Sequence, residues 1–265
     1  MPRRRRRSRT ARGQARGAGG QSPVNLAEYP DQMTHESGYS HAVDRALALS
    51  SLAHADKTRK GTLIPYVMHP VHVAMILQRY GYGEPLVIAA LLHDVIEDTR
   101  FGHWPLQAHL AHTFQGADLP MGVPAGTFRQ AVLAFIAREF GHEVLDLVQA
   151  VTEPKNDGGP ERTWRERREH QLAHLEHATT EVAALKAADL LHNIVSVVRD
   201  LSRDGPRVMD RFNAAPSESL WYYETAAGLA ARRLDRGGFA DELLEAVRAL
   251  RSTLERFGAV PCKRG

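Results

Sequence analysis

The chain has 265 residues, 43% of them hydrophobic and 25% charged, which is the composition of an ordinary soluble globular protein. No stretch approaches the roughly 18 uninterrupted apolar residues that indicate a membrane span, so the sequence argues against a membrane protein. The single cysteine, Cys262, excludes a disulfide framework within one chain, and we expect a protein of the reducing cytoplasm.

The net charge of +3 originates in the N-terminal segment rather than in the body of the chain. Eight of the 34 basic residues are arginines within the first 16 positions, and without them 31 acidic residues outnumber 26 basic ones. The segment has few apolar residues and no hydrophobic signal region, which predicts a disordered tail over residues 1–37. Its arginines resemble those of an organelle transit peptide, and they could also bind RNA or anionic lipid. We expect the tail to be functionally minor.

Helical periodicity dominates the chain from residue 38 to residue 258. Apolar residues recur at spacings of three and four, breaks containing Gly or Pro separate the runs, and no convincing strand alternation appears. The predicted helices span residues 41–55, 69–81, 84–98, 141–153, 180–201, 218–234 and 240–257. The sequence thus predicts one all-α domain of roughly eight to ten helices at 38–258, followed by a short C-terminal tail at 259–265. The segment 115–128 has no clear periodicity and is interpreted as a surface insertion near the functional region.

The stretch AALLHDVIEDT, residues 89–99, places an imidazole and three carboxylates where an apolar helix would continue. On a helix, His93 and Glu97 stack four residues apart, and Asp94 and Asp98 do the same in the neighbouring row. Buried carboxylates are costly unless they are paired or bound to a metal. Imidazole and carboxylate ligands suit Mn²⁺, Zn²⁺ or Fe²⁺, so the stretch predicts a divalent metal site.

A single helix offers only two or three ligands to one ion, so further ligands must come from other segments. His69 begins the second predicted helix, and Asp189 lies in an otherwise apolar helix face with Asn193 one turn later. Taken singly, each has a plain structural explanation: His69 could cap a helix, and Asp189 could bond a helix end or Lys186. Taken together with the stretch at 89–99, they favour a metal centre.

The order of these motifs resembles that of the HD-domain metal-dependent phosphohydrolases. The likeness is narrower to the hydrolase domain of the RelA/SpoT group and its small single-domain homologues. Residues 53–77 resemble that group's A-H-x-G-Q-x-R-K-x-G…P-Y…H-P segment, and residues 89–99 resemble its A-A-L-L-H-D-x-x-E-D-T core. Residues 140–155 and 185–201 are similar to its V-T-K helix and its L-K-x-A-D…N segment. The resemblance covers about residues 45–201.

The resemblance implies a role for each matching residue in a helical HD domain. The implied metal ligands, with Mn²⁺ as the expected ion, are His69, His93, Asp94 and Asp189. Glu97 and Asp98 would position or activate the attacking water. Arg59 and Lys60 match the basic pair that grips the base and phosphates of the substrate, and Asn193 matches an asparagine near the sugar. The implied reaction is hydrolysis of (p)ppGpp, which releases pyrophosphate from the 3′ position and leaves GDP or GTP.

The chain departs from the family pattern on the substrate side of the site. Leu190 stands where many members have lysine, and Ile194 and Val195 follow Asn193 where an arginine often lies. These changes keep open an HD phosphatase that acts on a nucleoside monophosphate or on the 2′-phosphate of NADPH. A non-catalytic nucleotide sensor is a third interpretation, although the presence of both Glu97 and Asp98 favours an active enzyme.

Overall fold

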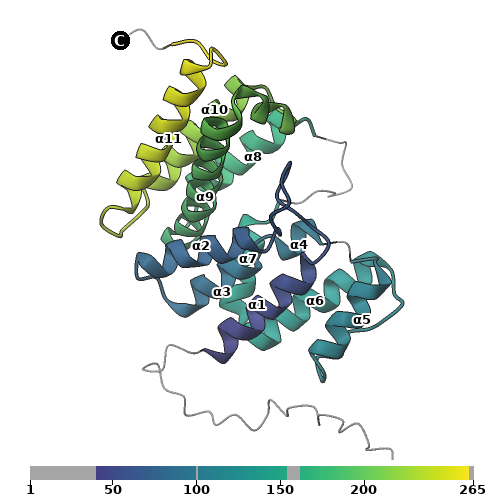
Figure 1. The fold of residues 1–265 in the computed structure, drawn as a ribbon. Coiled ribbons are helices and arrows are strands. Elements are labelled where there is room, and N and C mark those ends of the chain that lie inside the picture. Colours follow the sequence, from purple (N-terminus) through teal and green to yellow (C-terminus); the bar gives the residue numbers. More distant parts are fainter. Residues whose placement is uncertain (1–39, 100, 154–161, 263–265) are drawn as a thin grey trace, which may run out of the picture. The chain divides into compact units, whose positions relative to one another are not determined.

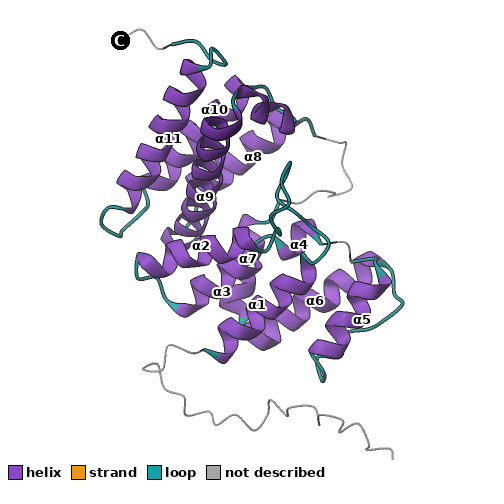
Figure 2. Ribbon diagram, viewed as in Figure 1, coloured by secondary structure: helices purple, strands orange, loops and turns teal. Residues whose placement is uncertain are grey.

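The structure, a computed structural model, describes residues 40–99, 101–153 and 162–262. These ranges contain eleven α-helices and one 3₁₀-helix and no β-strand, which confirms the all-α prediction and slightly exceeds its range of helices (Figures 1 and 2). No helix within them is long and apolar enough to cross a membrane. The chain divides into two units, residues 1–39 and 40–265, and the predicted tail at 1–37 lies outside the described residues.

A central apolar helix organises the N-terminal half of the fold. Helix α3 (Glu84–Leu92) is buried from Leu86 to Leu92, and it packs against α1 (His41–Ala53), α2 (Met68–Arg79) and α7 (His142–Val151). A helix that is hydrophobic on all sides must be surrounded by other elements, which explains its central position. The side chains that follow α3 therefore emerge inside the domain rather than on its surface.

The region after α3 contains two helices that the periodicity did not predict. These are α5 (Trp104–Thr113) and α6 (Ala125–Phe140), and the loop between them is tied to the Gln107 side chain. The Gln107 amide group donates to Val123 O at 2.9 Å, and its oxygen accepts the Gly122 N–H at 2.8 Å. The predicted insertion at 115–128 ends inside α6, which begins at Ala125. None of its residues lines either of the two cavities around the predicted metal ligands, which are described below.

The C-terminal half is built around the 25-residue helix α9 (Thr180–Asp204), which packs against α2, α10 and α11 (Figure 1). Small buried alanines on α9 allow its neighbours to approach closely. The remaining elements are α8 (Trp164–Glu176), a 3₁₀-helix (Pro206–Arg211), α10 (Pro216–Ala231) and α11 (Phe239–Arg256). Helix α8 was not predicted because it buries only Leu172 and Leu175, and a capping box at Thr163 defines its start instead.

The predicted helix 84–98 is interrupted. Helix α3 ends at Leu92 and the short α4 (Val95–Asp98) begins three residues later, with His93 and Asp94 in the turn between them. Neighbouring residues on a regular helix point about 100° apart, so they do not converge on one point. His93 and Asp94 keep right-handed helical backbone angles in this turn, and their side chains approach each other to 3.3 Å.

Candidate metal centre and active site

The four predicted metal ligands meet at the junction of three segments. His69 comes from the first turn of α2, His93 and Asp94 come from the turn after α3, and Asp189 comes from the middle of α9. His69 Nε2 lies 3.2 Å from Asp189 Oδ1 and 3.5 Å from Asp94 Oδ2. Ligand atoms of His69, His93 and Asp189 all lie within 4.8 Å of one another. This spacing allows several side chains to contact one ion.

The ring of His93 is held in the orientation that metal ligation requires. Its Nδ1 lies 2.7 Å from the Ala90 carbonyl oxygen, to which an Nδ1–H group donates. Its Nε2 is buried without a hydrogen-bond partner and approaches Asp94 Oδ2 at 3.3 Å. The Ala90 carbonyl keeps a proton on Nδ1, so a cation that displaces the proton from Nε2 would meet the Nε2 lone pair inside the cluster, and a backbone acceptor on the other nitrogen is common for metal-binding histidines.

Each carboxylate in the cluster also receives support from a neighbouring side chain. The Tyr66 hydroxyl donates to Asp94 Oδ2 at 2.7 Å. Lys186 Nζ donates to Asp189 Oδ2 at 2.7 Å, and Asn193 Nδ2 donates to Asp189 Oδ1 at 2.6 Å. These contacts fix the directions of the two carboxylates, as expected of the residues behind a metal ligand.

The electrostatics keep both carboxylates ionised. Burial raises the pKa of Asp94 and of Asp189, but this effect is outweighed by His93 beside Asp94 and by Lys186 beside Asp189, so both pKa values are lowered. Burial also lowers the pKa of both histidines. It dominates at His69, whereas at His93 the attraction of Asp94 outweighs it and raises the pKa to about 9. The cluster thus favours positive charge between two carboxylates, which suits a divalent cation.

Glu97 lies in the same cavity as the cluster, which has a volume of about 180 Å³. Its Oε2 accepts the Glu153 backbone N–H at 3.3 Å. Glu153 is itself anchored by Arg167 at 2.9 Å and by the Gln171 amide group at 3.1 Å, so α8 supports the position of Glu97 through this contact. The side chain of Asp98 lies outside the described part of the chain, and its role stays a prediction.

The predicted substrate-binding residues divide between two cavities. A second cavity of about 340 Å³ adjoins the first and shares Arg59, Tyr66, His69, Asn193 and Tyr223 with it. Arg59 Nη2 donates to Asn193 Oδ1 at 2.7 Å, and its guanidinium group lies 5.6 Å from the centre of the Tyr66 ring. Lys60 lines only the second cavity and donates to Asn213 Oδ1 at 3.3 Å. The structure therefore brings Arg59 and Asn193 to the cluster and places Lys60 farther out.

The loop that carries Arg59 and Lys60 has a defined conformation. The Arg59 N–H donates to Ile64 O at 2.8 Å, and an isolated β-bridge joins Thr58 to Pro65. Gly61 turns the chain with a φ of +74°, and a Cβ at this position would collide with the Arg211 side chain. The positive φ is the reason that favours glycine here, because the far end of the flexible Arg211 side chain can move away from a Cβ. The loop therefore forms one wall of the second cavity in a fixed conformation.

Three residues near the cluster were assigned no site role from the sequence. Tyr66 belongs to the Pro-Tyr pair of the resembled segment, but no spacing rule links it to Asp94. Lys186 precedes Asp189 by one helical turn, a spacing that does indicate contact. His192 Nδ1 lies 2.7 Å from His69 Nδ1, and burial, followed by the influence of His69, lowers the pKa of His192 to about 3. His192 was not recognised as a site residue from the sequence because it lies within an apolar helical run.

Comparisons with known proteins identify the family to which the chain is similar. The HD domain family matches residues 46–212. Guanosine-3′,5′-bis(diphosphate) 3′-pyrophosphohydrolases of Xenopus tropicalis and Danio rerio are 29% and 30% identical over 62% and 57% of the chain. The matches cover 71% and 62% of those proteins. An Aquifex aeolicus protein with the same activity in its name is 37% identical over 77 residues, which are 29% of this chain and only 11% of that protein.

Two solved structures share the fold. A metazoan ortholog of SpoT, described as hydrolysing ppGpp, superposes with a TM-score of 0.54 at 23% identity, over 79% of this chain and 96% of the other. A Listeria monocytogenes protein superposes with a TM-score of 0.50 at 30% identity, over 68% of this chain and 96% of the other. The likeness to the metazoan protein is evidence for the fold alone because its sequence identity is low.

Proposed function

The chain belongs to the HD domain family, and from this we propose that it is a divalent-metal-dependent phosphohydrolase that removes pyrophosphate from the 3′ position of (p)ppGpp. The observation that carries the proposal is the convergence of two imidazoles and two carboxylates from three separate segments. The names of relatives that match more than half of the chain support the choice of substrate. Cytoplasmic location is proposed from the cysteine content.

The proposed mechanism assigns the chain's groups by their positions. His69, His93, Asp94 and Asp189 hold the metal, for which we propose Mn²⁺ because the donors are imidazole nitrogen and carboxylate oxygen. A divalent ion supplies Lewis acidity, which makes water a stronger acid and polarises a phosphoryl oxygen. Glu97 lies in the cavity with a fixed carboxylate and accepts the proton of the attacking water, and Asp98 assists it.

The two adjoining cavities offer room for the two ends of a bis-pyrophosphate nucleotide. Arg59 lines both cavities, and Lys60, Arg199 and Arg211 line the second. Guanidinium groups bind phosphate oxygens in a fork geometry and stack on planar rings, so Arg59 can hold a base or a phosphate close to the reacting group. Asn193, which bonds both Arg59 and Asp189, connects this residue to the metal ligands.

The proposal is tested by a panel assay with Mn²⁺ against ppGpp, pppGpp, NADPH and nucleoside monophosphates. We expect release of pyrophosphate from ppGpp and pppGpp, with GDP and GTP as the nucleotide products. A metal-free sample treated with chelator serves as the control and should regain activity when Mn²⁺ is added. Release of inorganic phosphate from the other substrates, without pyrophosphate from ppGpp, would contradict the substrate assignment.

A second candidate, a phosphatase for another nucleotide, is favoured by one observation. Leu190 and Ile194 are almost completely buried, at 1% and 0% exposure. Val195, the other position where an arginine often lies in the resembled group, is 51% exposed and apolar, so none of the three positions supplies a basic side chain. The same panel assay separates the candidates, because NADPH or a monophosphate would then be the preferred substrate. A protein that only senses nucleotide would bind ppGpp and hydrolyse none of these substrates.

A further inference from the structure

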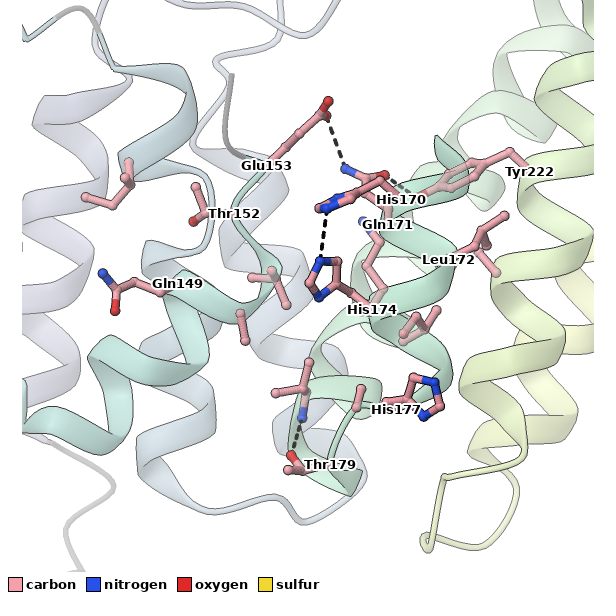
Figure 3. Close-up of a pocket in the computed structure, with 18 of the residues that line it drawn as sticks. Gln149, Thr152, Glu153, His170, Gln171, Leu172, His174, His177, Thr179 and Tyr222 are labelled. Carbon is pink, nitrogen blue, oxygen red and sulfur yellow. Dashed lines mark hydrogen bonds between the residues drawn. The ribbon is translucent and has the colours of Figure 1, made fainter. Parts of the chain in front are cut away.

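Two histidines on α8 face each other on a helix that the proposed reaction does not use for ligation. His170 and His174 lie four residues apart, so they share one face of the helix. Their Nε2 atoms lie 3.2 Å apart and their ring centroids lie 4.3 Å apart (Figure 3). Both side chains line a third cavity of about 570 Å³, formed mainly by residues of α7, α8 and α9. The pair contributes no atom to the cluster of His69 and its neighbours.

The distance between the two Nε2 atoms is close to the distance between two nitrogen ligands of one zinc ion. With Zn–N bonds of 2.0–2.1 Å and a tetrahedral angle, two nitrogens on one ion lie about 3.3 to 3.4 Å apart. The observed 3.2 Å is close to this value, and the rings, whose centroids lie 4.3 Å apart, would turn away from each other so that both lone pairs point at one ion. Two histidines at positions i and i+4 of a helix are also the spacing by which zinc metalloproteases hold their ion. We propose that His170 and His174 form a second metal site, selective for Zn²⁺ and similar imidazole-preferring ions.

The neighbouring residues identify this as a binding site rather than a second hydrolytic centre. In the zinc-protease spacing, the residue after the first histidine is a glutamate that acts as a general base. Here that residue is Gln171, which cannot accept a proton and whose amide group is bonded to Glu153 and Tyr222. No carboxylate forms an ion pair with either histidine within the described ranges, so the remaining coordination positions would be filled by water or by a small anion from solution.

One feature of the cavity suits an anion as the additional ligand. Arg129 lines the same cavity, and its Nε atom is buried without a hydrogen-bond partner in the described structure. A buried polar atom of this kind is uncommon and carries a free-energy cost that a bound ligand would relieve. The cavity therefore holds both the histidine pair and a guanidinium group, whose positive charge attracts a carboxylate or phosphate into the same space.

The test counts ions bound to the full chain. Protein stripped with chelator is dialysed against graded concentrations of Zn²⁺, and the bound metal is measured by mass spectrometry. We expect two ions for the wild type and, at Zn²⁺ concentrations too low to fill the weakened cluster, one for His93→Ala, whose remaining ion lies on α8. In the His93→Ala background, His170→Ala or His174→Ala should lower the affinity for the remaining ion at least tenfold, since each removes one of two chelating ligands.

The matched control is His177→Ala, which removes a histidine of the same cavity that is not paired with His170. It should leave both ions in place. Helical circular dichroism checks that each variant is folded, which we expect because the side chains of this pair lie at the surface. Cu²⁺ in the His93→Ala background gives a second readout, since electron paramagnetic resonance should show coupling to two imidazole nitrogens.

The proposal is wrong if His170→Ala and His174→Ala both retain wild-type Zn²⁺ affinity. It is also wrong if His174→Ala and His177→Ala release the ion while His170→Ala does not, because the ligands would then be a different pair. Neither result depends on the substrate of the hydrolase, so the failure of this proposal and the failure of the proposed function can be told apart.

Discussion

The cavity that holds the metal cluster and the neighbouring cavity beside α8 differ in size and in chemistry. The first has a volume of about 180 Å³ and is lined by ionisable groups that contact one another. The third cavity, beside α8, is about three times larger at 570 Å³, and most of its lining surface is apolar. Val151, Gln171, Lys186 and Tyr222 line both. Hydrolysis is assigned to the smaller cavity because its buried ionisable groups contact and orient one another. The volume of a cavity does not indicate which cavity is the reactive one.

The largest effect should come from the smaller cavity. His93→Ala and Asp189→Ala each remove a proposed metal ligand, and we expect metal affinity to fall at least tenfold and hydrolysis to be lost at limiting metal. Metal content of the purified variants measures the effect. His177→Ala, in the larger cavity, is the matched control and should change neither quantity. Unchanged metal content in both variants would show that His93 and Asp189 are not metal ligands.

The next effect separates metal binding from proton transfer. Glu97→Gln keeps the size of the side chain and its contact with the Glu153 N–H, but it removes the basic carboxylate. We expect turnover to fall by roughly 10²- to 10⁴-fold, the usual contribution of a positioned general base. Metal content should stay at the wild-type value. A variant with full turnover would show that Glu97 only shapes the cavity.

A smaller effect is expected at the edge where the first and second cavities join. Arg59→Ala removes the contact with Asn193 and the guanidinium group that both cavities share. If the substrate carries phosphates at both its 3′ and 5′ ends, KM should rise about tenfold or more, as expected for one lost charge-assisted contact. Lys60→Ala is the comparison variant, and we expect a smaller rise because Lys60 is exposed and farther from the cluster. Equal effects on ppGpp and on a monophosphate would contradict the assignment of Arg59 to a second phosphate group.

The smallest effect on activity should come from the apolar wall of the larger cavity. Leu175 is 6% exposed, and Leu175→Ala should lower the free energy of unfolding by about 2–5 kcal/mol, the usual cost of such a truncation in a core. The rate of hydrolysis at a temperature where the variant is folded should change by less than twofold. Denaturant unfolding and a rate assay measure the two quantities. A large loss of activity without a loss of stability would mean that the two cavities act as one site.

Much of the fold was predictable because strong local patterns specify it. The apolar runs that became α1, α2, α7, α9, α10 and α11 have clear periodicity, and their observed ends differ little from the predicted ones. The apolar face of α8 is narrow, whereas α6 buries Phe128, Val132, Phe135 and Ile136 at regular helical spacing, so this helix was missed although its pattern was present in the sequence. Helix α8 in particular is defined by its capping box and by its contacts with α10. Helix propensity averaged over a short stretch of sequence does not reveal tertiary contacts of this kind.

The residue types of the candidate centre were determined by the sequence alone. The order of His69, the stretch at 89–99 and Asp189 was sufficient to predict a metal site of imidazole and carboxylate ligands, since ligand chemistry depends on the side chains themselves. Tertiary structure decided the rest. Two contacts join segments far apart in the chain: Tyr66 donates to Asp94, and the Glu153 N–H donates to Glu97. The end of α3 at Leu92 is a further feature that the periodicity did not show. The positions of these segments follow from the packing of α2, α3, α7 and α9, and packing is a property of the whole core that no local motif encodes.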